Sequence, residues 1–218
     1  MDMASPLRRC EPPRNCRRCP RLVALRRECR AEHPDWWNAP VPVFGDGDGW
    51  LALVGLAPGR LGANRTGRPF TGDRSGDVLF DALARFGLSK GRFDGRADDG
   101  LVLDGAMIFN AVKCLPPDNR PLPSEIAACR RYFERQLAAM PRLRVIIALG
   151  RIAHEAVLRA AGERLAAHPF AHGAVHRISG DRYLVDSYHC SRYNMNTGRL
   201  TPDMFAGMFA SAMALRDK

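Results

Sequence analysis

The chain has 218 residues, 46% of them hydrophobic, and its 33 lysine and arginine residues against 23 aspartate and glutamate residues give a net charge of +10. This composition is typical of one folded domain and excludes a disordered or fibrous chain. There is no run of about 18 apolar residues, and the N-terminus lacks the apolar segment of a secretory signal. We therefore expect a cytoplasmic protein that does not bind membranes.

Arginine is concentrated in the first 30 residues, a segment with little apolar content. Leu22, Val23 and Leu25 predict one short helix there. Clustered cations favour a nucleic-acid partner, because they displace condensed counterions, although the arginine bias also fits a GC-rich genome. We interpret residues 1–45 as an extension of a single domain that spans 1–218.

Seven cysteines suggest metal binding in a reducing compartment, where disulfides are rare. Cys16 and Cys19 form a C-x2-C pair, and Cys114 and Cys129 form a second pair with fourteen residues between them. Four thiolates suit either a tetrahedral zinc ion or an iron–sulfur cluster. The alternative is that Cys114 and Cys129 are ordinary buried cysteines. Three cysteines stay unassigned: Cys10, Cys29 and Cys190.

After a proline-rich stretch, short apolar runs alternate with segments of helical periodicity. The apolar runs predict four strands, at 50–55, 106–112, 144–149 and 183–186. The periodic segments predict four helices, at 75–86, 123–140, 152–161 and 202–215. Such alternation implies parallel pairing through right-handed crossovers. We therefore expect an α/β fold, a three-layer α/β/α sandwich with a mainly parallel four-stranded sheet. Ligands bind such sheets at the carboxyl ends of the strands.

The loop after the first predicted strand is rich in glycine, with the motifs GLAPG and GANRTGRPFTGD. It matches neither a dinucleotide fingerprint nor a phosphate loop, since it contains no G-x-G-x-x-G and no Gly-Lys-Ser/Thr. Asp73 directly precedes a predicted helix, where it either caps that helix or positions a water molecule at a pocket. Phe70 is either a core residue or a surface on which a base stacks.

Two later strands also lead into polar residues. Asn110, in the motif FNAVKC, is either a structural asparagine or a residue that reads the edge of a pyrimidine. His189, in the motif YHCSRYNMNTGRLT, precedes small, polar and basic residues that suit a loop contacting nucleic acid. We interpret the remaining histidines as mainly structural: His33, His154, His168, His172 and His176. Of these, His168 and His172 flank a segment that could border the pocket.

Together the four motifs resemble those of the family 5 (type B) uracil-DNA glycosylases, and they occur in the family's order. The resemblance implies a four-stranded α/β/α glycosylase fold with a structural [4Fe–4S] cluster. The cluster would be bound by Cys16, Cys19, Cys114 and Cys129 and would attach the arginine-rich extension to the domain. Zinc at the same cysteines is the alternative.

The resemblance also implies roles for single residues. The family's catalytic aspartate falls on Asp73, its second-motif histidine on His189 and its base-reading asparagine on Asn110. Its stacking aromatic residue falls on Phe70. In this assignment His189 donates to uracil O2, Asn110 reads the N3/O4 edge and Asp73 positions the water.

Residues of the first motif would contact the substrate: Gly55, Leu56 and Ala57. Related families carry a polar or acidic residue in this motif, whereas Leu56 and Ala57 are apolar. Asp73 would therefore have to activate the water. Residues of the last motif would contact DNA: Arg192, Asn194, Thr197 and Arg199.

The resemblance implies a monomeric, monofunctional DNA glycosylase. It would flip uracil out of double- or single-stranded DNA and hydrolyse the N-glycosidic bond, initiating base excision repair. Hypoxanthine and xanthine are further expected substrates. The alternative from another class is a non-catalytic, zinc-bearing nucleic-acid-binding module, which would need neither Asp73 nor His189. A hydrolase built on Cys190 is excluded, because adjacent side chains of an extended segment point to opposite sides.

Overall fold

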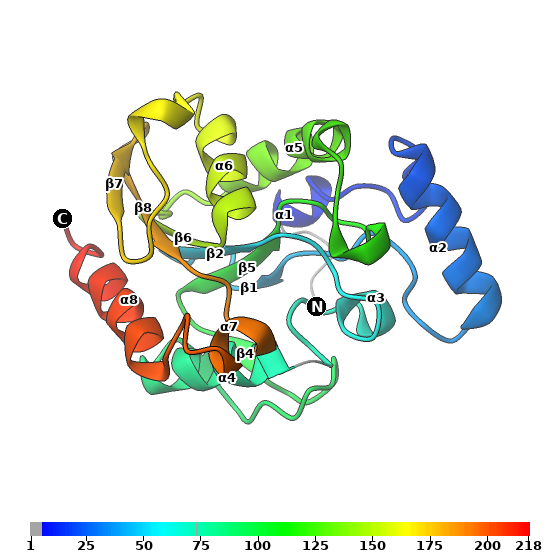
Figure 1. The fold of residues 1–218 in the computed structure, drawn as a ribbon, viewed down its shortest axis with the longest axis horizontal. Helices are drawn as coiled ribbons and strands as arrows, with labels where there is room; N and C mark the ends of the chain where they lie inside the picture. The colour runs from blue at the N-terminus through cyan, green and yellow to red at the C-terminus, as the bar shows by residue number, and fades with distance from the viewer. Residues whose placement is uncertain (1–5, 73) are drawn as a thin grey trace.

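The computed structural model describes residues 6–72 and 74–218. Within these residues a six-stranded sheet forms the middle layer, in the order β1-β5-β2-β6-β8-β7 (Figure 1). Its strands are β1 (Phe44–Gly45), β2 (Leu51–Gly55), β5 (Ala106–Asn110), β6 (Val145–Leu149), β7 (Val175–Ile178) and β8 (Arg182–Ser187). A separate hairpin pairs β3 (Ser89–Lys90) with β4 (Val102–Leu103).

The four central strands, β5, β2, β6 and β8, are parallel, which confirms the predicted α/β sandwich. The antiparallel edge strands β1 and β7 were not predicted. Their sequences carry no strand signal, because β1 has only 2 residues and β7 alternates between exposed and partly buried positions until Ile178.

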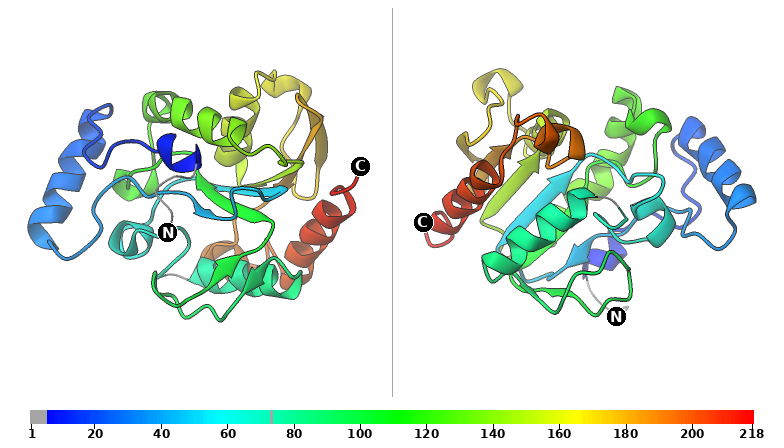
Figure 2. Two further views of the ribbon diagram at one scale, coloured as in Figure 1. Left: turned by 180° about the vertical axis from the view of Figure 1, so that it is seen from behind. Right: turned by 60° about the horizontal axis from the view of Figure 1, so that its bottom comes forward.

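Helices cover both faces of the sheet (Figures 1 and 2). The elements α1, α5 and α6 cover one face, whereas α4 and α8 cover the other. The helices are α1 (Pro6–Arg9), α2 (Pro20–Glu32), α3 (Ala63–Thr66), α4 (Arg74–Arg85), α5 (Pro123–Ala138), α6 (Arg151–Ala160), α7 (Arg192–Asn196) and α8 (Pro202–Ala214). In the part of the chain that is described, no helix is long and apolar enough to cross a membrane.

Alternating residues of β2 explain how one strand serves two cores. Leu51 and Leu53 pack into the cluster shared with α4 and α8, while Ala52 and Val54 pack into the cluster shared with α5 and α6. Successive side chains of a strand point to opposite faces, so a strand covered on both sides must be apolar throughout. This is why β2, β5 and β6 were readable as apolar runs.

The N-terminal segment contains a longer helix than predicted. Helix α2 has 13 residues, begins with Pro20 at its first turn and lies at the side of the molecule, away from the sheet (Figures 1 and 2). Arg21 Nη2 lies 2.7 Å from Glu125 Oε2, and Glu125 also accepts a hydrogen bond from the Leu122 amide at the start of α5. This contact joins α2 to the first turn of α5.

A buried ion pair anchors the glycine-rich loop after β2. Arg68 Nη1 and Nη2 each donate to one Asp99 carboxylate oxygen at 2.6 Å, and the two side chains are 5% and 1% exposed. The Asp99 carboxylate also accepts from the Leu101 amide at 3.0 Å. The hydrogen bonds from Arg68 lower the pKa of the Asp99 carboxyl group from 3.8 to about 2.

We expect Asp99→Asn to lower the free energy of unfolding by about 3 kcal/mol at pH 7, because it leaves the Arg68 guanidinium buried without its counter-charge. The unfolded carboxyl group titrates near 3.9, roughly, and the folded one near 2. The stabilisation is therefore fully present above about pH 4 and is lost as the pH falls through about 2. Urea unfolding of the wild type and of Asp99→Asn should show that the difference between their free energies of unfolding narrows as the pH falls through that range.

The matched control is Asp98→Asn. Asp98 forms an exposed ion pair with Arg96, with side chains 72% and 67% exposed, so its loss should cost less than about 1 kcal/mol. Equal destabilisation by the two variants would contradict the assignment of the buried pair as the anchor.

Candidate active site

A cavity of about 340 Å³ lies at the carboxyl ends of the parallel strands. Its lining includes five residues that the sequence singled out: Leu56, Ala57, Phe70, Asn110 and His189. These residues come from the ends of β2 and β5, from the glycine-rich loop and from the segment after β8. The structure thus brings together motifs that lie more than a hundred residues apart in the chain.

Gly55 makes room for two of these side chains. It is the last residue of β2 and pairs in parallel register with Asn110, the last residue of β5. A Cβ atom at Gly55 would lie 3.1 Å from both Asn110 Oδ1 and Phe70 Cζ. Asn110 is 4% exposed, so its amide is buried where strand and cavity meet. A larger residue at this strand end would therefore force both side chains to move by a few tenths of an ångström.

Phe70 is held in an uncommon backbone conformation. Its φ is +56°, in the left-handed region that aromatic residues rarely adopt. The Thr71 hydroxyl bonds both the Arg68 carbonyl oxygen, at 2.8 Å, and the Thr66 hydroxyl. The Phe70 ring lies 6.0 Å from the His189 ring, with 20° between their planes. Strain of this kind is typical of a functional constraint.

The segment that carries His189 is fixed by its own hydrogen bonds. The Asn194 side-chain amide donates to the His189 carbonyl oxygen at 2.8 Å, and the Ser191 hydroxyl caps α7 by accepting from the Asn194 amide. Cys190, next to His189, is buried and its thiol donates to the Ser75 carbonyl oxygen at 3.6 Å. These contacts fix the backbone from which the His189 imidazole extends.

The remaining predicted site residues lie around this cavity or outside the described chain. Asp73 is outside the described residues; it directly precedes α4 in the sequence. The predicted DNA-contacting residues lie on α7 or just after it: Arg192, Asn194, Thr197 and Arg199. Asn194 is partly buried, and the other three are exposed. The Arg199 guanidinium lies 4.7 Å from the Tyr188 ring centroid, beside the His189 segment.

Some lining residues were missed by sequence reasoning. Asn119 and Ser191 line the cavity, as do Pro58 and Ala63. Asn119 lies in the turn after β5 and has a φ of +55°. The sequence Pro-Pro-Asp-Asn, which is typical of a turn, could have predicted it. In contrast, His168 and His172 do not line the cavity.

A second, smaller cavity is lined by Cys16, Cys19, Cys114 and Cys129, which come from the N-terminal segment, the loop after β5 and α5. Hydrogen-bond donors lie close to these sulfur atoms. The Lys113 amide donates to Cys129 Sγ at 3.3 Å, and Arg26 Nη1 donates to Cys114 Sγ at 3.6 Å.

The surroundings of these cysteines suit ligands of a cationic group. Burial raises the pKa of the Cys19 thiol to about 11 and that of Cys114 to about 12, and the neighbouring Cys129 acts in the same direction on both. Thiolates in such a place need positive charge beside them, which a metal centre supplies. In a tetrahedral zinc site, sulfur atoms lie about 3.8 Å apart. Among the described cysteines, no three have sulfur atoms all within 4.8 Å of one another, so their spacing is wider than one zinc ion requires.

Comparison with known proteins identifies the class to which this fold and site belong. The model of the uracil DNA glycosylase superfamily matches residues 42–212. That range contains β2, β5, β6 and β8 and every residue named in the lining of the first cavity. The chain therefore belongs to the uracil-DNA glycosylase superfamily.

Curated relatives define the family within it. A type-5 uracil-DNA glycosylase of Thermus thermophilus is 49% identical, over 92% of this chain and 93% of the relative. Type-5 enzymes of Pyrobaculum aerophilum and Mycobacterium bovis are 44% and 42% identical, each over 92% of this chain and over 88% and 78% of their own lengths. The chain is thus a member of the type-5 uracil-DNA glycosylase family, which confirms the predicted family and enzyme class, a monofunctional glycosylase.

We expect Gly55→Ala to impair uracil excision without unfolding the protein. The new methyl group would lie 3.1 Å from Asn110 Oδ1 and Phe70 Cζ, so both side chains must shift within the cavity wall. A misplacement of 1 Å costs about a hundredfold in rate, and the shift required here is a few tenths of an ångström, so we expect a smaller loss of kcat/KM, of up to about tenfold. Release of uracil from a labelled oligonucleotide measures it.

Gly207→Ala is the control, because a Cβ atom there meets nothing within 4 Å on the exposed face of α8. It should leave excision unchanged and slightly stabilise the helix. Unchanged excision by Gly55→Ala would show that the strand end does not shape the substrate site.

Proposed function

We propose that this protein removes uracil from DNA by hydrolysing the N-glycosidic bond and thereby starts base excision repair. The observation that carries the proposal is the single cavity that unites a strained aromatic residue, Phe70, with a buried amide, Asn110, and an imidazole, His189. These three side chains supply what recognition of a pyrimidine requires: a flat apolar surface, a donor and acceptor pair, and a further donor.

In this proposal His189 stabilises the departing base. Cleavage gives the base negative charge on its carbonyl oxygens while the sugar becomes cation-like, so a donor placed at uracil O2 favours the transition state. Asn110 bonds the N3/O4 edge, and its burial at a strand end excludes competing water. Phe70 stacks on the ring, and Asp73 positions the attacking water at the sugar carbon.

The target nucleotide would be flipped from the duplex into the cavity, at a cost of a few kcal/mol that is smallest for mispaired bases. Arg192, Thr197 and Arg199, exposed beside the His189 segment, would contact the DNA backbone. Leu56 and Ala57 in the lining are apolar, which favours a broad range of bases, so hypoxanthine and xanthine are proposed as further substrates. The protein would act as a cytoplasmic monomer on double- or single-stranded DNA.

The four cysteines would bind a structural [4Fe–4S] cluster, with zinc as the alternative. The wide spacing of the sulfur atoms favours the cluster over zinc. Two buried cations, which would balance the negative charge of the cluster, favour it as well: Arg26, which donates to Cys114, and Lys113. The Lys113 ammonium group has no hydrogen-bond partner among the described residues. The cluster would supply a crosslink rather than a step of the reaction, attaching residues 1–45 to the loop after β5.

His189→Ala and Asp73→Ala should each lower the rate of uracil release by about a hundredfold or more, because each removes a group that acts in the transition state. Affinity for a uracil-containing duplex should stay within a few fold, since neither group is needed to bind phosphate. Single-turnover kinetics and fluorescence anisotropy separate the two effects.

His33→Ala serves as the control, since His33 stacks on Trp36 and lies outside the cavity lining. Wild-type protein that binds DNA but releases no base would support the non-catalytic module instead. Full turnover in His189→Ala would refute the proposed role of that residue.

Cys129→Ser should lower the iron content of the purified protein and abolish its visible absorption, because it removes one of the four proposed ligands. Cys10→Ser is the matched control, as Cys10 does not line the cysteine cavity and should leave iron unchanged. Metal analysis by mass spectrometry gives iron and zinc together. Wild-type protein that holds zinc and no iron at these cysteines would contradict the cluster.

A further inference from the structure

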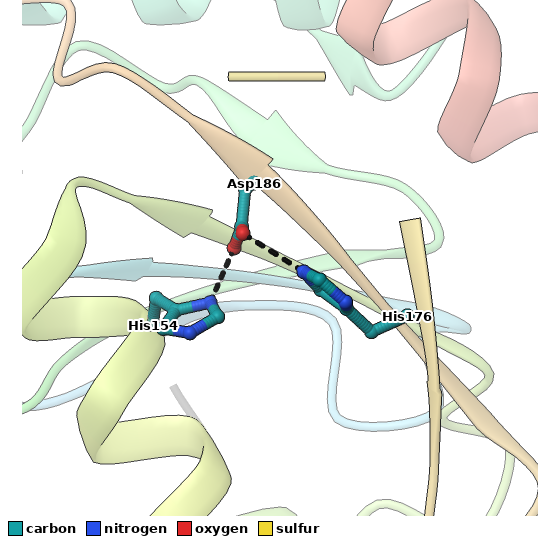
Figure 3. A group of neighbouring side chains, drawn as sticks. All are labelled: His154, His176 and Asp186. Carbon is teal, nitrogen blue, oxygen red and sulfur yellow. Dashed lines mark hydrogen bonds and ion pairs between the residues drawn. The ribbon is translucent and has the colours of Figure 1, made fainter. Parts of the chain in front are cut away.

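A group of three polar side chains lies outside the cavity described above. His154 of α6, His176 of β7 and Asp186 of β8 converge from three elements, with the carboxylate between the two rings (Figure 3). Asp186 Oδ1 lies 2.7 Å from His154 Nδ1, and Asp186 Oδ2 lies 3.1 Å from His176 Nε2. The Asp186 and His154 side chains are 0% and 3% exposed, and that of His176 is 10% exposed.

A carboxylate buried this deeply needs a cation beside it. In residues 6–72 and 74–218, the ion-pair partners of Asp186 are these two histidines, and no arginine or lysine reaches it. The proposed glycosylase reaction uses none of the three side chains, because none lines its cavity. Their burial therefore requires an explanation of its own.

The protonation of His154 restricts that explanation. Its Nε2 lies 2.9 Å from the backbone carbonyl oxygen of His168, and a carbonyl oxygen can only accept, so Nε2 carries a hydrogen. In the neutral ring Nδ1 then presents a lone pair toward the Asp186 carboxylate. Two lone pairs that face each other at this distance repel, unless a proton lies between the two atoms or both atoms move slightly apart to bind one metal ion.

Three observations favour a metal ion. The ligand atoms of the three residues lie within 4.8 Å of one another, and among the described histidine, cysteine and acidic residues no other such group exists. Two imidazoles and one carboxylate are a common ligand set for zinc and related divalent ions. The bond from the second nitrogen of His154 to a backbone carbonyl is the outer contact that metal-binding imidazoles usually make.

We propose that His154 Nδ1, His176 Nε2 and the Asp186 carboxylate bind a divalent transition-metal ion of the zinc type. Tetrahedral bonds of about 2.1 Å place ligand atoms about 3.4 Å apart. The present separations of 2.7 and 3.1 Å reach this spacing through side-chain shifts of less than about 1 Å. The fourth position is left to water, which enters past the partly exposed His176.

Such an ion would join the edge of the sheet to its helical layer. In the sheet formed by the described residues, β7 is an edge strand that pairs with β8. An ion bound by His176, Asp186 and His154 would therefore hold β7 to both β8 and α6. Asp186 precedes His189 by three residues, so the ion would also fix the strand that leads into the active site.

The first test is calorimetric titration of the purified protein, with its cysteine centre loaded, using ZnCl₂ after dialysis against EDTA. We expect one binding site per chain. His176→Gln should weaken it by more than about a hundredfold, since even outer contacts of such ligands are worth tenfold to a hundredfold. His33→Gln, at a histidine remote in sequence from the group, should bind zinc as the wild type does.

Cobalt(II) identifies the ligands. Bound at this site it should give visible d–d bands without thiolate-to-cobalt charge transfer, which separates it from any binding at the cysteines. Zinc should also raise the Tm of the wild type by mass action, a readout that needs no variant. Asp186→Asn is the second variant if His176→Gln does not fold.

The absence of stoichiometric zinc binding, or binding that His176→Gln and Asp186→Asn leave unchanged, would overturn the proposal. The group would then be a hydrogen-bonded set without a metal ion. Uracil excision by wild-type protein is measured separately, so failure of the metal site leaves the proposed function standing, and the reverse also holds.

Discussion

The parallel register that places Gly55 opposite Asn110 is the constraint on which the active site depends. Parallel strands bring their carboxyl ends to one edge of the sheet, so the loops after β2 and β5 must share the same space. Glycine at position 55 lets the Asn110 amide and the Phe70 ring keep their present positions, since each would lie 3.1 Å from an added Cβ atom and would have to move by a few tenths of an ångström. The glycine that ends β2 therefore helps to shape the wall of the cavity.

A buried ion pair helps to hold the loop that carries Phe70, whose side chain also packs against the core cluster shared with α4 and α8. The Arg68 guanidinium is buried against Asp99 and lies 5.0 Å from the Phe44 ring and 5.4 Å from the Phe80 ring. Two residues later, Phe70 adopts its left-handed backbone conformation. A buried bidentate pair has one good geometry, so it can fix a strained segment where apolar packing would allow several arrangements.

The sequence predicted the fold where physical signals are local and strong. The strands around Leu53, Ile108 and Ile147 were predicted because burial on both faces demands uniform apolarity. Strands β1 and β7 were not predicted, because an edge strand pairs with one neighbour and tolerates exposed residues, so its sequence need not be apolar. The site motifs were located at the ends of the predicted strands, and the resemblance supplied their roles. The grouping of His154 with Asp186, in contrast, depends on three elements meeting in space and has no sequence period. Asp186, a carboxylate ending an apolar run, was its one local signal.

The two polar centres outside the cavity have equivalent positions relative to it. Cys114 follows Asn110 by four residues, and Asp186 precedes His189 by three. Each centre therefore lies on the same short segment as a proposed catalytic residue and joins that segment to a helix, α5 through Cys129 and α6 through His154. Loops at a strand end are ordinarily the most mobile parts of an α/β fold, and a donor must be placed within fractions of an ångström to stabilise a transition state. The proposed cluster at the cysteines and the proposed ion at Asp186, four and three residues from Asn110 and His189, would provide that rigidity without occupying the cavity in which the base must fit.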